Sequence, residues 1–241
     1  MLESQSAEVE VIEAENGSEL KKLFQDRKRT NILNSVESAA LLYFVKRLPG
    51  YITPNILTGI AIGGSFVMLI SFILATFISS NYLLLGIVGL FINWFGDSLD
   101  GRVAYYRQIP RKWYGFSLDI IMDWVSVVFM GFGYMVYAKG MNELLAYSFV
   151  VLYGWAMIIA ILRYKINNQY TIDAGYIGPT ELRVIVAVIL IMEIIIPNFI
   201  NYCMGLVCLI FIYNNIKDTN KLLDLGDVRD KKEKAEKGNI E

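Results

Sequence analysis

Long apolar stretches alternate with short polar connections along most of the chain. A helix needs about 20 predominantly apolar residues to cross a bilayer. Stretches of about this length cover residues 55–79, 82–105, 114–138, 143–164, 181–198 and 199–217. Hydrophobic residues make up 55% of the 241 residues and charged residues only 19%, whereas soluble domains carry about 25% charged residues. The pattern predicts an all-α, polytopic membrane protein with six transmembrane helices.

The flanks of this apolar region differ from it in composition. Residues 1–34 are acidic at first and then basic, and lack a hydrophobic signal region, so we expect a largely disordered N-terminal segment. Residues 51–218 would form the six-helix domain. Residues 219–241 are rich in charge and would form a charged cytoplasmic tail.

Residues 35–50 are amphipathic and precede the first apolar stretch. The apolar side chains here could face lipid; they are Leu41, Leu42, Phe44 and Val45. The basic side chains of Lys46 and Arg47 would stay in water. This arrangement predicts an interfacial helix that ends near Pro49. An ordinary basic flank of the first span explains the pattern equally well.

Basic residues gather in alternate connections. If the N-terminus is cytoplasmic, the three outside connections hold only Lys139, and the inside segments hold fourteen other Lys and Arg residues between Lys21 and Lys221. The positive-inside rule therefore predicts that both termini are cytoplasmic. It also places the facing ends of the second and third spans on the cytoplasmic side.

Two residue types restrict the available chemistry. The two cysteines, Cys203 and Cys208, lie in one apolar stretch and suggest neither a disulfide framework nor a zinc site. The chain contains no histidine. Proton transfer must then use Asp, Glu, Lys, Tyr or water, and a metal ion would need oxygen ligands.

Four aspartates interrupt the second and third apolar stretches. At 100° per residue, Asp97 and Asp100 share one helical stripe with two small residues, Gly101 and Ala104. On the third span, a second stripe holds Gly115, Asp119 and Asp123. Each helix therefore offers a pair of carboxylates beside residues that let a helix or a ligand approach closely.

Four carboxylates at membrane depth need protons or cations to offset their repulsion and desolvation. Oxygen ligands without histidine favour Mg²⁺ or Mn²⁺ over zinc. Two divalent ions shared by four carboxylates would suit phosphoryl transfer. Three other interpretations stay open: a structural cluster paired with Arg102 and Arg107, an ion-coupled transporter, and an aspartate-rich polyprenyl transferase.

The stretch from Asp97 to Asp123 closely resembles the signature of the CDP-alcohol phosphotransferase family, D-x2-D-G-x2-A-R-x8-9-G-x3-D-x3-D. The matching residues are Asp97, Asp100, Gly101, Ala104, Gly115, Asp119 and Asp123. Tyr105 stands where the family has arginine. "TPNILT", from Thr53 to Thr58, is similar to a Pro-Asn element that opens the family's first span. The resemblance covers roughly residues 40–215 and includes the six-span plan.

The resemblance implies an enzyme of phospholipid biosynthesis that transfers a substituted phosphate from a CDP-linked donor to an alcohol and releases CMP. The four aspartates would hold two divalent ions, Mg²⁺ or Mn²⁺, and Asp123 would also act as general base. The nucleotide would be bound by Thr53, Pro54, Asn55, Gly101, Ala104 and Gly115. Arg107 could replace the missing arginine; a degenerate, weakly active family member is the alternative.

A second polar element, "IGPTELR", leads into the fifth apolar stretch. Arg183 within it, and Arg163 before it, could bind a substrate phosphate or could simply flank the membrane. Glu193 lies deeper, and the sequence leaves its role undecided. The acceptor and donor also stay open: a small alcohol with CDP-diacylglycerol, or a lipid alcohol with a CDP-linked head group. We expect a homodimer, contact with membrane lipids and no nucleic-acid partner.

Overall fold

The computed structural model describes residues 34–167 and 179–238. Within these ranges every regular element is helical. In chain order they are α2 (Asn34–Arg47), α3 (Pro54–Phe77), the short 3₁₀ helix η1 (Ser80–Tyr82), α4 (Leu83–Tyr106), α5 (Lys112–Tyr137), η2 (Gly140–Asn142), α6 (Glu143–Asn167), α7 (Pro179–Ile195) and α8 (Phe199–Gly238). The segment predicted to be disordered lies almost wholly outside the described residues.

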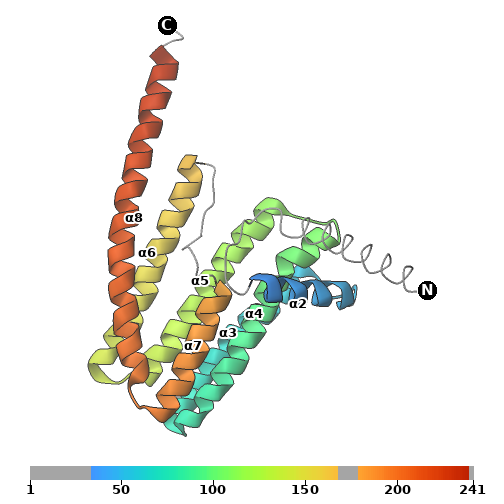
Figure 1. Cartoon of the computed structure of the whole chain (residues 1–241), viewed down its shortest axis with the longest axis vertical. Helices are drawn as coiled ribbons and strands as arrows, with labels where there is room; N and C mark the ends of the chain where they lie inside the picture. Colours follow the sequence, from blue (N-terminus) through green and yellow to red (C-terminus); the bar gives the residue numbers. More distant parts are fainter. Residues whose placement is uncertain (1–33, 168–178, 239–241) are drawn as a thin grey trace, which may run out of the picture.

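The helices form an antiparallel bundle (Figure 1). Five segments are long and apolar enough to cross a membrane: Pro54–Phe77, Ser80–Tyr106, Lys112–Tyr137, Gly140–Ile166 and Phe199–Ala235. α7 has 17 residues, the lower limit for a spanning helix, and runs alongside the others in the bundle. The predicted all-α, multi-pass architecture is confirmed.

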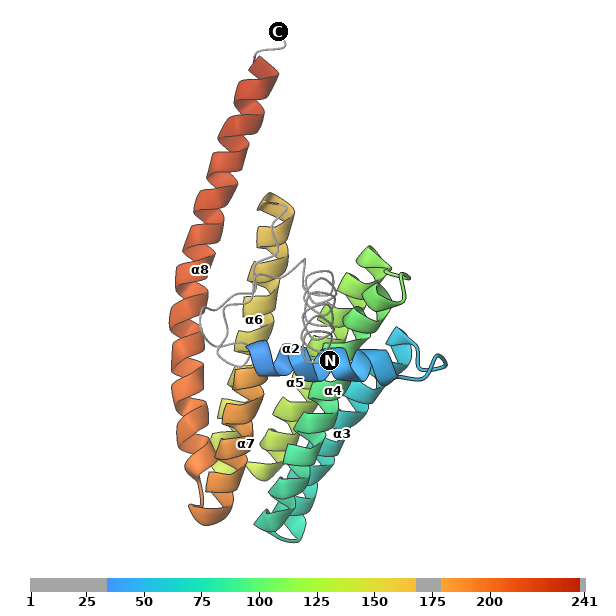
Figure 2. The same cartoon turned by 45° about the vertical axis from the view of Figure 1, so that its right-hand side comes forward.

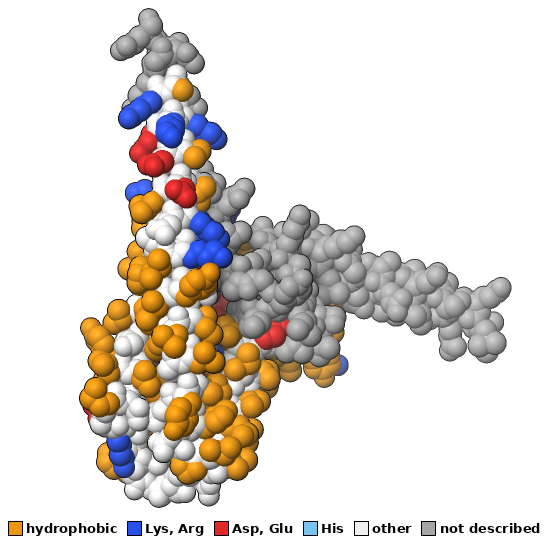
Figure 3. All heavy atoms as spheres, turned by 60° about the vertical axis from the view of Figure 1, so that its left-hand side comes forward, with side chains coloured by type: hydrophobic (Ala, Val, Ile, Leu, Met, Phe, Trp, Pro, Cys, Tyr) orange, Lys and Arg blue, Asp and Glu red, His pale blue; other side chains and the backbone are white. Residues whose placement is uncertain are grey.

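The outer surface agrees with a membrane protein. Apolar side chains cover most of the bundle face seen in Figure 3, and charged side chains gather where α8 projects beyond the bundle. α8 is one helix of 40 residues, so it continues without a break from the sixth apolar stretch into the charged tail. Arg229 in its projecting part donates hydrogen bonds to the carbonyls of Lys165 and Ile166, 2.8 and 3.1 Å away, and so caps the last turn of α6.

α3 packs against α4 at backbone distance. A Cβ atom at Gly89 would lie 2.7 Å from the Gly64 carbonyl oxygen, and one at Gly64 would lie 2.6 Å from the Gly89 carbonyl oxygen. A Cβ at Gly96 would collide with the Leu57 carbonyl and the Ala61 amide. Small residues at these crossings let the two backbones meet, which fixes how α3 faces the polar end of α4.

α2 crosses the bundle at a steep angle near the start of α3 (Figures 1 and 2). The sequence allowed the apolar side chains of this helix to face lipid, but Leu41 and Val45 do not. Both are buried in a cluster with Leu57, Leu99 and Val103. Leu42 is also largely buried, and the Phe44 ring packs edge-on against Phe95 at 5.2 Å. The apolar face of α2 therefore covers α3 and α4.

Glu193 has a structural role at the opposite end of the bundle. Its buried carboxylate accepts hydrogen bonds from the Asn198 and Ile200 amides, at 3.0 and 2.8 Å, and from the Tyr137 hydroxyl at 2.9 Å. These amides lie at the N-terminus of α8, where backbone N–H groups lack partners within the helix. Glu193 thus joins α7, α5 and the start of α8.

Candidate metal and nucleotide site

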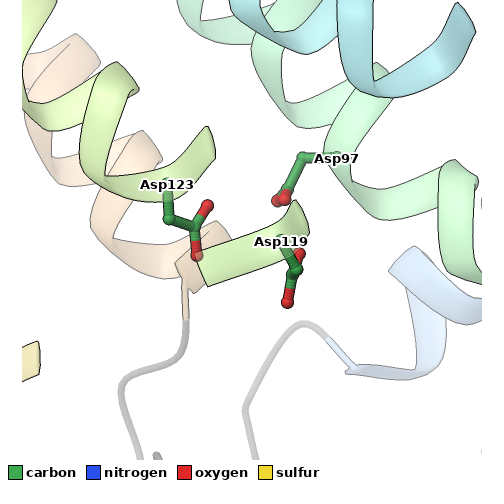
Figure 4. A group of neighbouring side chains, drawn as sticks. All are labelled: Asp97, Asp119 and Asp123. Carbon is green, nitrogen blue, oxygen red and sulfur yellow. The ribbon is translucent and has the colours of Figure 1, made fainter. Parts of the chain in front are cut away.

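Three carboxylates meet between α4 and α5. Asp97 comes from α4, and Asp119 and Asp123 come from successive turns of α5 (Figure 4). Each contributes a carboxylate oxygen to a group whose atoms all lie within 4.8 Å of one another. Hard oxygen ligands at this separation suit a divalent cation such as Mg²⁺ or Mn²⁺, so these residues could hold a metal ion.

Asp100, the fourth aspartate, lines the same cleft but is held by α3. Its carboxylate accepts a hydrogen bond of 2.7 Å from the Thr58 hydroxyl and one of 2.5 Å from the Gly101 amide. Thr58 lies one turn into α3 and is largely buried. The glycine-mediated contact of α3 with α4 therefore brings Thr58 to the carboxylate and fixes its orientation.

A cation from α7 also reaches this group of carboxylates. The Arg183 guanidinium donates a hydrogen bond of 2.7 Å to Asp97 and one of 3.1 Å to the side-chain oxygen of Asn93. The Asn93 amide nitrogen in turn donates to the Ala61 carbonyl and to the Ser65 hydroxyl on α3. This network joins α3, α4 and α7 beside Asp97.

The cleft itself lies between α3, α4 and α5. It is lined by Thr58, Ala61, Ile62, Asn93, Asp97, Asp100, Asp119, Met122, Asp123 and Ser126. Polar and charged groups concentrate along it although the surrounding helices are apolar. Such a concave site with convergent polar groups is the usual setting for ligand binding.

Two glycines of the signature leave open space. Within the described residues, a Cβ at Gly101 or at Gly115 would have no heavy atom of another element within 4 Å. The glycines of the α3–α4 crossing behave oppositely, because a Cβ there would strike backbone. Gly101 and Gly115 are therefore not needed for helix packing, and their space is available to a ligand. Ala104 follows on the same stripe of α4 and is partly buried.

The Pro-Asn element opens α3. Thr53 is the N-cap residue, and its hydroxyl accepts a hydrogen bond of 3.3 Å from the Ile56 amide, while Pro54 occupies the first turn. Asn55 connects to α5: its oxygen accepts a 2.7 Å hydrogen bond from Arg111, and its nitrogen donates to the Tyr114 hydroxyl at 3.3 Å. The element thus ties the start of α3 to the start of α5.

Two predicted arginines have their contacts elsewhere. The Arg107 guanidinium donates to the carbonyls of Leu48, Pro49, Gly50 and Ile52, which holds the connection between α2 and α3. Arg163 lies 3.5 Å from Asp218 in an ion pair between α6 and α8. Of the three arginines proposed from the sequence, Arg183 is the one that contacts the aspartates.

Sequence reasoning overlooked three residues: Thr58, Asn93 and Arg111. Asn93 lies one turn before Asp97, and a polar side chain in an apolar stretch was a usable signal. Thr58 lies one turn after Asn55 on the same side of α3. Arg111 gave no signal because its partner Asn55 is 56 residues away.

A family model described as CDP-alcohol phosphatidyltransferase matches residues 51–213. The chain belongs to this family. The match covers α3 through the first part of α8, to residue 213, and includes every residue of the cleft described above. A search of curated proteins found no match. Membership makes the protein a membrane transferase that acts on a CDP-alcohol.

The hydrogen bond from Thr58 to Asp100 generates a prediction about metal binding. Thr58→Val removes the donor with little change of shape and should weaken Mn²⁺ binding about 10-fold, a typical loss when a residue that orients a metal-binding group is changed. Thr58→Ser keeps the hydroxyl and should bind nearly as wild type does. Electron paramagnetic resonance of free Mn²⁺ during titration measures the affinity.

Thr76→Val is the matched control, because Thr76 lies on the same helix and its hydroxyl donates to the carbonyls of Phe72 and Val136, which lie outside the cleft. Equal affinities for Thr58→Val and Thr76→Val would show that Thr58 does not orient a metal-binding carboxylate.

Proposed function

We propose that this protein transfers a substituted phosphate from a CDP-linked donor to an alcohol, with release of CMP, in phospholipid biosynthesis. The observation that carries the proposal is the group of carboxylates from Asp97, Asp119 and Asp123, within 4.8 Å of one another in the cleft. Family membership supplies the class of donor.

Asp97, Asp119 and Asp123 would hold divalent metal, Mg²⁺ or Mn²⁺, with Asp100 as a further ligand for a second ion. A bound divalent ion neutralises diphosphate charge and stabilises the charge that develops on the leaving phosphate. In the proposal, the hydroxyl of Thr58 orients Asp100, and Arg183 orients Asp97 through its 2.7 Å contact.

Asp123 is the general base of the proposal. It lies one turn beyond Asp119 on the same stripe of α5 and lines the cleft together with Ser126. The alcohol hydroxyl would lose its proton to this carboxylate as its oxygen attacks the phosphorus. The bond between that phosphorus and the CMP oxygen then breaks, and CMP leaves. With no histidine in the chain, a carboxylate is the available base of suitable strength.

The remaining residues would bind and position the substrates. Gly101, Ala104 and Gly115 leave space for the nucleotide, since a Cβ at either glycine meets open space. Arg183 can bind an acceptor or donor phosphate from the α7 side of the cleft. Arg163 forms an ion pair with Asp218, and this contact does not favour phosphate binding by Arg163. Two substrate pairs fit: a small alcohol with CDP-diacylglycerol, or a lipid alcohol with a CDP-linked head group.

A transporter that uses the same carboxylates is the competing function, because intramembrane acids also carry Na⁺ or H⁺. Discontinuous helices at mid-membrane are typical of such transporters. α3, α4 and α5 run without a break through the cleft, which favours the transferase.

We predict that CMP release requires a divalent ion and each of the four aspartates. Asp97→Asn, Asp100→Asn, Asp119→Asn and Asp123→Asn should each lower the rate of CMP release by at least about 100-fold, because each removes a charge that binds metal or accepts a proton. A panel of CDP-linked donors and alcohols with the purified protein in nanodiscs provides the assay.

Asp227→Asn is the control, since Asp227 is exposed on the projecting part of α8, and it should retain wild-type rates. Full CMP release in EDTA, or by two folded aspartate variants, would contradict the metal mechanism. CMP release by no donor in wild type would contradict the proposed reaction.

The orientation of the site is a second part of the proposal. The connection between α4 and α5 is rich in basic residues, including Arg111 and Lys112, whereas the connections at the other end of the bundle hold only Lys139. By the positive-inside rule, this difference supports a site that opens to the cytoplasm. A cytoplasmic opening would give the cleft access to water-soluble nucleotide.

We therefore predict one-sided labelling of cysteines at the two ends of the bundle. In a variant without Cys203 and Cys208, Ile109→Cys should react with an impermeant maleimide only from the cytoplasmic side, and Met141→Cys only from the other. Both side chains are exposed, at 55% and 83%. The reverse labelling pattern would overturn the proposed orientation.

A further inference from the structure

The signature of this chain lacks one guanidinium, because Tyr105 stands where the family pattern has arginine. Three arginines lie close enough in sequence to replace it: Arg102, Arg107 and Arg111. A planar guanidinium binds phosphate oxygens with two parallel hydrogen bonds, which a tyrosine hydroxyl cannot reproduce. The contacts of the three arginines therefore indicate which one is available to a ligand.

Arg102 and Arg107 are both engaged in holding the fold. Arg102 is largely buried, donates to the Ser98 carbonyl and lies 4.0 Å from Glu37 of α2. Arg107 donates to four carbonyls of the connection between α2 and α3, at 2.6 to 3.3 Å. If Arg107 bound a ligand instead, these carbonyls would lose their hydrogen-bond donor. Arg107 is therefore disfavoured as the residue that replaces the missing arginine.

Arg111 differs from both because it is exposed and oriented by side chains. Its guanidinium lies 3.9 Å above the Tyr114 ring and donates a 2.7 Å hydrogen bond to Asn55. The ring covers one face of the guanidinium, and Asn55 uses one of its five N–H donors. The group is thus held in place with further donors still able to bind an anion.

Arg111 is connected to residues of the cleft along both α5 and α3. Arg111 is the N-cap residue of α5, and Gly115, Asp119 and Asp123 follow it at intervals of four residues. The Gly115 amide bonds to the Arg111 carbonyl at 2.7 Å. On α3, its partner Asn55 lies one turn before Thr58, which contacts Asp100. The contact of Arg111 with Asn55 therefore joins the starts of α3 and α5, the ends from which both helices run toward the cleft residues.

We infer that Arg111 binds the diphosphate of the CDP-linked donor, in place of the guanidinium that the family pattern puts at position 105. This inference rests on the proposed function. The open space at Gly115, which lies between Arg111 and Asp119 along the chain, leaves room for a diphosphate that contacts both the guanidinium and the metal held by the carboxylates. Asn55 and Tyr114 are positioning residues, since they orient the guanidinium.

Binding of CDP, CMP and cytidine to the full-length protein in nanodiscs with MgCl₂, measured by calorimetry, tests the inference. Arg111→Ala should weaken CDP binding about 10- to 100-fold, the loss expected for a hydrogen bond to a charged group. Cytidine, which has no phosphate, should bind Arg111→Ala and wild type equally. Tyr105→Arg should restore CDP affinity to the Arg111→Ala variant.

Lys112→Ala removes an adjacent, exposed positive charge and should change CDP affinity less than about threefold. CDP affinity of folded Arg111→Ala equal to that of Lys112→Ala would overturn the role of Arg111 and leave the proposed reaction standing. Failure of Tyr105→Arg to restore affinity would overturn the replacement of one guanidinium by the other. A wild-type protein that binds no CDP and releases no CMP would overturn the proposed function as well.

Discussion

The close contact between the backbones of α3 and α4 determines the arrangement of the site. Gly64 and Gly89 meet across this contact. Nearer the polar end of α4, Gly96 lies against the backbone of Leu57 and Ala61. Because no side chain separates the helices there, Thr58 reaches Asp100 with a 2.7 Å hydrogen bond. Larger residues at these glycines would push α3 away, and Asp100 would lose the group that orients it.

A second set of polar contacts attaches the other helices to this pair. Arg183 of α7 bonds to Asn93 and Asp97 of α4, and Thr180, one turn earlier, donates a 3.0 Å hydrogen bond to Glu37 of α2. Charged and polar groups at membrane depth are costly unless they are paired. Their pairing here locates α7 and α2 beside the carboxylates, so the same residues serve folding and the site.

The sequence was sufficient to predict the helical bundle and the aspartates, and the reasons are physical. Apolar stretches of membrane length are a strong signal, and carboxylates one turn apart on a helix must share a face. Contacts between distant segments could not be predicted in this way. The bonds from Arg107 to residues 48–52 and from Glu193 to the start of α8 depend on how helices pack. The apolar face of α2 fits lipid and protein equally well as a pattern, and only packing shows that Leu41 and Val45 cover α3 and α4.

The central claim is that Asp97, Asp119 and Asp123 together bind a divalent cation. A structure of the protein with Mn²⁺, determined with data collected for anomalous scattering, tests it most directly. We predict an anomalous peak between these three carboxylates, bonded to an oxygen of each, with Arg183 displaced from the oxygen that the ion takes. A peak elsewhere, or no peak with Arg183 still paired to Asp97, would contradict the claim.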